Sequence, residues 1–169
     1  MKYPCMILQG DRAQGYMMSL AVSGASQHQH TGGKIIHRGS STHATIVSKS
    51  LCHSGGISSY AGSINVERGA TEAHTHVQCH TLLLDEHSKA TSSPYLNVAM
   101  LDARIGHEAS VSSLDESQMA YLASRGIDTA VARVLLVNGF VSDFVNELPM
   151  EYALELNRLI LLEMNKSIG

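Results

Sequence analysis

The 169-residue sequence predicts a mainly β region up to about residue 112, followed by a helical region from 113 to 169. Two differences between the parts indicate this division. All 10 histidines lie between His28 and His107, and 11 of the 14 glycines lie at or before Gly106. The first part has 8 basic and 7 acidic side chains, whereas the second has 4 basic and 8 acidic ones and is rich in Leu, Ala, Met and Glu.

The β region contains short strand-like runs separated by turn signals such as Gly32-Gly33 and Gly55-Gly56. The candidate strands are 16–22, 34–38, 43–52, 57–66, 73–84 and 95–105. Alternation is clear after residue 73, where one face carries His74, His76, Gln78 and His80 and the other carries Thr75, Val77, Cys79 and Thr81. We expect the first of these faces to be exposed to solvent and the second to face a core. Recurrence of strands at intervals of roughly 10 to 20 residues is typical of a solenoid, but a sandwich fits the composition nearly as well.

The first two helices are marked by their ends. Ser113 and Glu116 have the spacing of a capping box, which predicts a helix that runs to Arg125 and is followed by Gly126. A second helix is predicted from Thr129, capped by Asp128, to Asn138, where Gly139 ends it.

The last helix is predicted from about residue 150 to 165, directly after Pro149. Its apolar face is expected to contain Tyr152, Leu156, Leu159 and Ile160. Glu155 and Arg158 have the spacing of an ion pair on the flank of this face. Because residues 159–162 are apolar almost all round, we expect this helix to be buried on more than one side.

Composition excludes several classes of protein. A net charge of −3 argues against nonspecific electrostatic binding to nucleic acid. No apolar stretch approaches the roughly 18 residues that cross a membrane, and the start of the chain shows no secretory signal, so we expect a cytoplasmic protein. The three cysteines, Cys5, Cys52 and Cys79, are widely spaced and odd in number, which is unlike a disulfide framework or a zinc finger.

Motifs of familiar enzymes are also missing from the sequence. It contains no P-loop, no G-x-G-x-x-G, no G-x-S-x-G and no H-E-x-x-H. We therefore expect no stand-alone enzyme and no nucleotide bound by this chain.

The sequence does offer soft metal ligands in pairs, namely Cys52-His53, His74-x-His76, Cys79-His80 and His107-Glu108. Thiolate and imidazole suit zinc, copper(I) or iron–sulfur species. Plainer interpretations remain open: Cys79 as a buried structural cysteine, the histidine face as solvated, and Glu108 as a solvated acid just before the helical region.

Several stretches together resemble the SufB/SufD family of iron–sulfur cluster assembly proteins. They are 39–48, 59–62, QCHTLLL at 78–84, SPYL at 93–96, HEASVSSL at 107–114, YLASRGI at 121–127, NGF at 138–140 and ELPME at 147–151. The run ELPMEYALE places the resemblance closer to the C-terminal part of SufB than to SufD. It covers about residues 32–165 and leaves the first 30 or so residues without an assigned structure.

The resemblance implies a short right-handed parallel β-helix up to residue 112 and a small helical domain over 113–169. It also implies a scaffold that assembles a transient [4Fe–4S] or [2Fe–2S] cluster and passes it on. The implied partners are a SufC-type ATPase on the helical region and a second SufB/SufD-like chain, or a second copy, at the end of the β-helix. ATPase activity is expected in the partner, and neither nucleic acid nor membrane is expected.

Site residues follow from the same resemblance. Cys79 corresponds to the cysteine that the family uses in cluster assembly, and His107 and Glu108 correspond to its HEA motif. His80 stands where the family has Asp and is a further candidate metal ligand. Family chains are longer, and their upstream residues for sulfur entry cannot be assigned to Cys5 or Cys52.

Two alternatives remain. The missing rungs of a full-length family member suggest an interaction module that binds its partners without cluster chemistry. The ten histidines suggest instead a solenoid that binds zinc or another metal.

Overall fold

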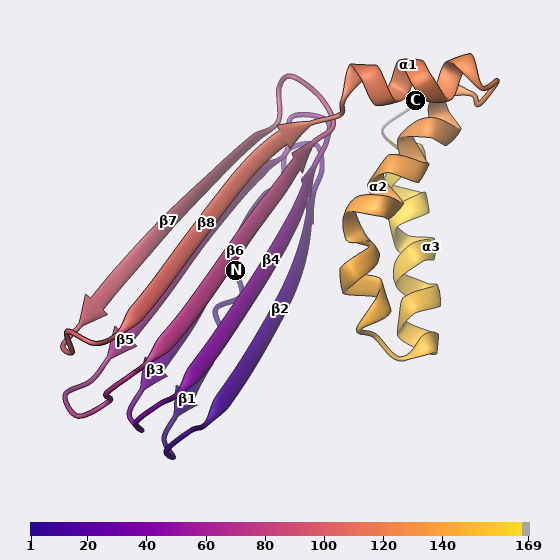
Figure 1. Cartoon of the computed structure of the whole chain (residues 1–169). Coiled ribbons are helices and arrows are strands. Elements are labelled where there is room, and N and C mark those ends of the chain that lie inside the picture. Colours follow the sequence, from indigo (N-terminus) through magenta and orange to yellow (C-terminus); the bar gives the residue numbers. More distant parts are fainter. Residues whose placement is uncertain (167–169) are drawn as a thin grey trace.

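The computed structural model describes residues 1–166, and the side chains of residues 1–163, as a parallel β-solenoid of about four turns followed by helices (Figure 1). The strands are β1 (Cys5–Leu8), β2 (Gln14–Ser23), β3 (His28–His37), β4 (His43–Cys52), β5 (Ile57–Val66), β6 (His74–Leu83), β7 (Lys89–Val98) and β8 (Arg104–Ser113). The helices are α1 (Glu116–Ser124), α2 (Thr129–Asn146) and α3 (Met150–Lys166). The predicted solenoid with a helical end is confirmed.

Each turn of the solenoid contributes one strand to each of two sheets. One sheet has the order β1-β3-β5-β7 and the other β2-β4-β6-β8, and every neighbouring pair is parallel. The register is continuous, because Gln14 pairs with His43, His43 with His74, and His74 with Arg104. An all-parallel arrangement of this kind excludes the antiparallel sandwich, the other fold that the composition allowed.

The space between the sheets is apolar at one end and polar at the other. The apolar end is filled by Leu8, Ile35, Ala44, Ile46, Ile64, Val66 and Val77. Toward the other end the inward positions carry hydroxyl groups, and Ser50 Oγ lies 2.7 Å from Thr81 Oγ1. The alternation predicted for 60–66 is confirmed, and the one predicted for 74–81 is confirmed as far as Cys79, since Thr81 is half-buried.

The corners of successive turns stack with the same backbone conformation. Arg12, Ser41 and Glu72 have φ values of 59°, 53° and 52° at matching corners. The Ser41 N–H donates to the carbonyl of Thr71 on the next turn at 2.8 Å. The Glu72 N–H finds no such carbonyl and donates to the Asp102 side chain at 3.0 Å. At the last turn, the Asp102 carboxylate thus takes the place of the backbone carbonyl in the hydrogen bonds that link successive corners.

His37 is a fully buried polar group in the interior. Its Nδ1 lies 2.7 Å from Thr42 Oγ1 and its Nε2 lies 2.6 Å from Thr75 Oγ1. Thr42 Oγ1 donates to the Gly39 carbonyl at 3.3 Å, so Nδ1 is the nitrogen that donates to Thr42 and Nε2 accepts from Thr75. Burial, with a smaller effect of His43, lowers the pKa of His37, so the ring is neutral in the folded chain.

We predict that this histidine makes the fold sensitive to acid. Below about pH 6.5, His37 becomes protonated in the unfolded chain but stays neutral in the folded chain. The free energy of unfolding therefore decreases as the pH falls. The midpoint of urea unfolding, measured at pH 8 and pH 5.5, should drop less in His37→Gln than in the wild type. The exposed His76 provides the control, and His76→Gln should keep the wild-type drop. An equal drop in His37→Gln and the wild type would contradict the prediction.

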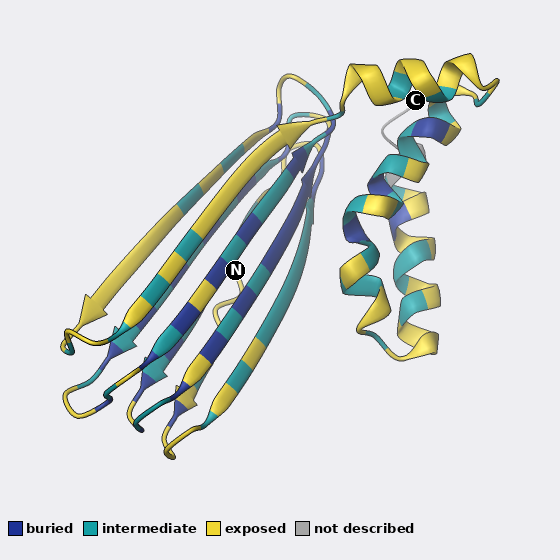
Figure 2. Cartoon of the chain, viewed as in Figure 1, coloured by how far each residue is buried: buried dark blue, intermediate teal, exposed yellow. Residues whose placement is uncertain are grey.

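Helices α2 and α3 cover part of the outer face of the β2-β4-β6-β8 sheet (Figure 1). Leu51 on β4 and Leu82 on β6 point outward and pack against α2 and α3. Val137 and Val141 are fully buried there, whereas α1 lies at the edge and is mostly exposed (Figure 2). This second apolar cluster comprises Leu51, Leu82, Leu84, Val137, Val141 and Ile160.

A buried lysine adds a polar contact between the sheet and α2. Lys49 Nζ donates to the Phe140 carbonyl at 2.7 Å and to Asp143 Oδ2 at 2.9 Å. It also lies 5.2 Å from the centre of the Phe140 ring. These contacts lower the pKa of Asp143 and satisfy a charge that burial alone would penalise.

Several expectations for the β region were wrong at the level of single elements. The predicted turn at Gly32-Gly33 lies inside β3, where both glycines pair with β5, so the strand expected at 34–38 begins earlier, at His28. The strand expected at 95–105 combines the end of β7 with the start of β8, across a turn at residues 99–103. The strand at Cys5–Leu8 was not predicted, because four residues give too little alternation to detect.

Three predictions for the helices also need correction. Asp115, not Ser113, caps α1, and its side chain accepts from the Ser117 N–H. Helix α2 continues through Gly139 to Asn146, because a glycine inside a helix weakens it without ending it. On α3, Ile160 is buried, but Tyr152 and Leu159 are 68% and 50% exposed, so the helix is buried on one side only. The predicted pair of Glu155 and Arg158 is present at 3.9 Å.

Within residues 1–166, no helix has the length and apolarity that a membrane crossing requires.

Candidate functional site

The last turn of the solenoid leaves one strand of each sheet at an open edge. β7 and β8 are the terminal strands of their sheets and are mostly exposed (Figure 2). Large apolar side chains on these strands face outward or toward the rim, among them Tyr95, Leu96 and Val111, which are 66%, 49% and 56% exposed. An unpaired strand edge with exposed apolar residues is a surface on which another chain can pair.

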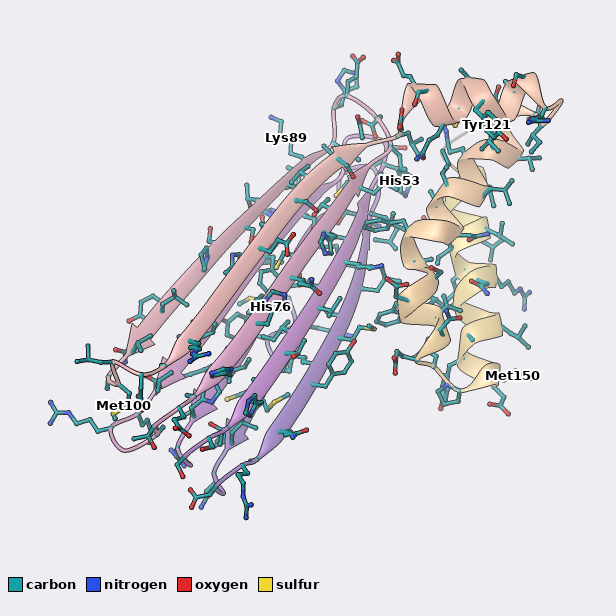
Figure 3. The ribbon with its side chains drawn as sticks, viewed as in Figure 1. His53, His76, Lys89, Met100, Tyr121 and Met150 are labelled. Atoms are coloured by element: carbon teal, nitrogen blue, oxygen red, sulfur yellow. The ribbon has the colours of Figure 1, made fainter. Side chains whose placement is uncertain are left out.

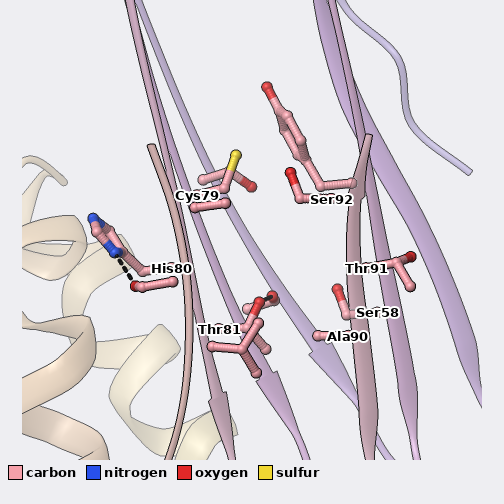
Figure 4. Close-up of a pocket in the computed structure, with 13 residues that line it drawn as sticks. Ser58, Cys79, His80, Thr81, Ala90, Thr91 and Ser92 are labelled. Carbon is pink, nitrogen blue, oxygen red and sulfur yellow. Dashed lines mark hydrogen bonds between the residues drawn. The ribbon is translucent and has the colours of Figure 1, made fainter. Parts of the chain in front are cut away.

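Cys79 lies one strand in from this rim, on the inward face of β6. Its side chain points between the two sheets and is 6% exposed (Figure 4). Burial raises the pKa of the thiol to about 11, although Ser92 and Tyr60 act in the opposite direction. The thiol is therefore protonated in this chain at neutral pH, and becomes a strong ligand or nucleophile only when its proton is removed.

His107 on β8 is brought into contact with Cys79. The Sγ and Nε2 atoms are 3.7 Å apart, a distance that suits a weak hydrogen bond from the thiol to a neutral imidazole. Burial lowers the pKa of His107, which keeps its ring neutral. A thiol beside a neutral imidazole can pass its proton to the ring, and both groups can then bind a soft metal.

Glu108 lies on the opposite face of the same strand. It pairs in register with Gln78, so its side chain projects outward while those of His107 and Cys79 project inward. The side chain is exposed. The expectation that Glu108 sits just before the helical region was wrong, because β8 continues for five more residues.

His80 also lies on the outer face, separated from Cys79 by the strand. Its Nδ1 is 2.7 Å from Ser110 Oγ (Figure 4). It lines an open groove between the sheet and α2 together with Lys49, Gln78 and Asp143. Of the four predicted ligands, the structure thus brings together Cys79 and His107, and places Glu108 and His80 on the other side of the sheet.

The remaining soft-ligand pairs do not converge with these residues. Cys52 is fully buried at the far end of the polar interior, and burial raises its pKa to about 11. The rings of His43 and His74 lie 5.0 Å apart between centres, tilted by 52°, on the outer face, where His76 also lies (Figure 3). Among the described side chains, no group of three or more His, Cys, Asp and Glu is placed to hold a metal ion.

A small cavity beside Cys79 contains residues that the sequence analysis did not single out. It has a volume of about 20 Å³ and lies between the sheets, where Tyr60 and Ser92 face Cys79 and Ala109. Tyr60 and Ser92 are inward neighbours on β5 and β7. The alternation of 60–66 signalled that Tyr60 points inward, but only the fold shows that it meets Cys79.

Comparison with known proteins supplies a family context for this geometry. The family model described as "SUF system FeS cluster assembly, SufBD core domain" matches residues 1–140. The chain is 44% identical to the iron–sulfur cluster assembly protein SufB of Bacillus subtilis over 169 residues, which are 100% of this chain and 36% of the relative. It is 45% identical to an iron–sulfur cluster assembly SufBD family protein of Mycobacterium leprae, again over 100% of this chain but 19% of the relative.

A SufBD family protein of Staphylococcus saprophyticus is similar to the same degree, with 44% identity over 100% of this chain and 36% of the relative. The chain therefore spans between about a fifth and just over a third of the length of the relatives that it matches.

Proposed function

The chain belongs to the SufB/SufD family of iron–sulfur cluster assembly proteins, and on this premise we propose that it forms the part of a scaffold at which iron and sulfur gather. The observation that carries the proposal is the 3.7 Å contact between Cys79 Sγ and His107 Nε2 beside the open rim of the solenoid. The predicted cysteine and histidine come from strands that are separate in sequence, yet they meet in the fold.

The chemistry of these groups suits a cluster that is cargo and not a permanent cofactor. Once Cys79 loses its proton, its thiolate can bind iron or accept sulfur, and the neutral His107 ring can bind iron beside it. Two protein ligands hold a cluster more loosely than the four cysteines of a permanent site, which favours its release. Glu108 lies on the outer face of the edge strand with its carboxylate exposed, so it does not share the site of Cys79 and His107 within one chain.

We propose two partners for the exposed surfaces. The unpaired edges of β7 and β8 would pair with a second SufB/SufD-like chain or a second copy of this one. The helical region would receive a SufC-type ATPase, which would supply the energy for assembly, and its exposed apolar residues such as Leu135, Tyr152 and Leu154 support this role.

The cysteines Cys5, Cys52 and Cys79 are all free, which fits a cytoplasmic location.

Anaerobic reconstitution tests the proposed function. We expect the wild-type chain, incubated with ferrous iron and sulfide, to develop the visible absorption of an iron–sulfur cluster and then to activate an apo-ferredoxin. Ferredoxin with iron and sulfide but no chain, and a mock reconstitution of the chain without iron, serve as controls. Failure to retain iron and sulfide, with binding to the ATPase intact, would contradict the scaffold role and favour the interaction module.

A further inference from the structure

Two buried hydroxyl groups face the Cys79 thiol from the opposite sheet. Tyr60 on β5 and Ser92 on β7 are paired in register and line the cavity that Cys79 also lines (Figure 4). Among the described residues, neither Tyr60 Oη nor Ser92 Oγ has an oxygen or nitrogen atom as a hydrogen-bond partner, and both hydroxyls act on the Cys79 thiol, whose pKa they lower. The Tyr60 side chain is only 6% exposed, so bulk water does not serve as its partner either.

Unpaired hydroxyls are unfavourable in such a place. A buried O–H without a partner destabilises a fold, and an apolar side chain of similar shape would avoid that cost. Neighbouring hydroxyls in the same interior are paired, as Ser50 is with Thr81 at 2.7 Å and Ser19 with Ser48 at 3.0 Å. The donor capacity of Tyr60 and Ser92 is therefore directed only at the sulfur of Cys79, a weak acceptor while the thiol keeps its proton.

The fold also keeps the Tyr60 ring in place and leaves space next to it. A side chain at Gly62 would bring a Cβ atom to 3.0 Å from Cε1 and 3.4 Å from Oη of Tyr60, so the ring lies over this glycine. The cavity of about 20 Å³ holds about one atom the size of a water oxygen. One additional atom attached to Cys79 would thus meet the O–H groups of Tyr60 and Ser92.

We propose that Tyr60 and Ser92 are positioning residues for the sulfur that Cys79 receives, their hydroxyls donating hydrogen bonds to its terminal, negatively charged sulfur. This inference rests on the proposed function and adds to it the groups that hold the sulfur before iron arrives. In the loading step the Cys79 thiolate attacks the outer sulfur of a donor persulfide, R–S–SH. A new S–S bond forms on Cys79, the S–S bond of the donor breaks, and the donor leaves as a thiolate that takes up the proton lost by Cys79. The transferred sulfur arrives with its S–H proton, and release of this proton to water leaves the terminal sulfur negatively charged. No net oxidation or reduction occurs.

Retention of this sulfur by the full chain provides the test. The chain is loaded anaerobically with glutathione persulfide and desalted, and the sulfane sulfur that remains is measured over time by cyanolysis. Hydrogen bonds to a charged group are strong, so we expect Tyr60→Phe and Ser92→Ala each to lose the sulfur about tenfold faster than the wild type. Ser92→Thr keeps a hydroxyl at this position, so this variant should retain the sulfur as long as the wild type does.

Matched variants separate the possible outcomes. Ser58 lines the same cavity beside Ala90 (Figure 4), so Ser58→Ala should retain sulfur as the wild type does. The urea midpoint of Tyr60→Phe should fall little, because the lost hydroxyl meets only the weakly accepting thiol of Cys79 in the folded chain. Wild-type retention in Tyr60→Phe and Ser92→Ala, with no uptake by Cys79→Ala, would overturn the positioning role and leave the proposed function intact. Full uptake by Cys79→Ala would overturn both.

Discussion

Replacement of Val141 by Asp is expected to detach helices α2 and α3 from the solenoid. Val141 is fully buried between the sheet and the helices, in the cluster that contains Leu51, Leu82 and Ile160. An aspartate there would place a charge without a partner among apolar side chains, which costs about 3–5 kcal/mol. Between Ser113 and Glu116, the segment that joins the two parts adds the partly buried Leu114, which packs against this same cluster.

Limited proteolysis and urea unfolding measure this effect. We expect Val141→Asp to be cut rapidly within the helical region, and its first unfolding step to occur at a lower urea concentration than in the wild type. Val131 provides a matched control on the same helix, because it is 52% exposed and its replacement by Asp should change stability by less than about 0.5 kcal/mol. Similar behaviour of the two variants would show that the helices do not depend on the apolar cluster.

Much of the fold follows from patterns that are local in the sequence. β4 and β5 have the bounds that were predicted for them, since β5 alternates over its whole length, β4 alternates over its first half, and both are followed by turn signals. The terminal strands were harder to predict because β7 and β8 are exposed on both faces and so have no apolar period. The outward Leu51 and Leu82 break the alternation of their strands for a reason that lies far away in the chain, where α2 packs against them.

The candidate site, like the fold, could be predicted from the sequence only in part. Motif resemblance selected Cys79, His107 and Glu108, but a motif does not say on which face of a strand each residue points. His107 and Glu108 are adjacent, and adjacent residues of a strand project to opposite sides, so they cannot both face Cys79 in this arrangement. Tyr60 and Ser92 belong to two other strands, and their meeting with Cys79 depends on how the turns stack.

The central claim, that Cys79 is where iron and sulfur gather, is tested most directly by comparing two cysteine variants. Cys52 is the matched control, because it is also buried and its pKa is also raised to about 11. It lies at the other end of the sheet from His107, since it is in register with Leu83 and Ser113, and its thiol contacts the Lys89 carbonyl at 3.7 Å. Both variants, Cys79→Ala and Cys52→Ala, are reconstituted anaerobically beside the wild type, and the iron and acid-labile sulfide retained per chain are counted. We predict that Cys52→Ala retains the wild-type amounts and that Cys79→Ala retains almost none. Equal retention by the two variants would contradict the claim.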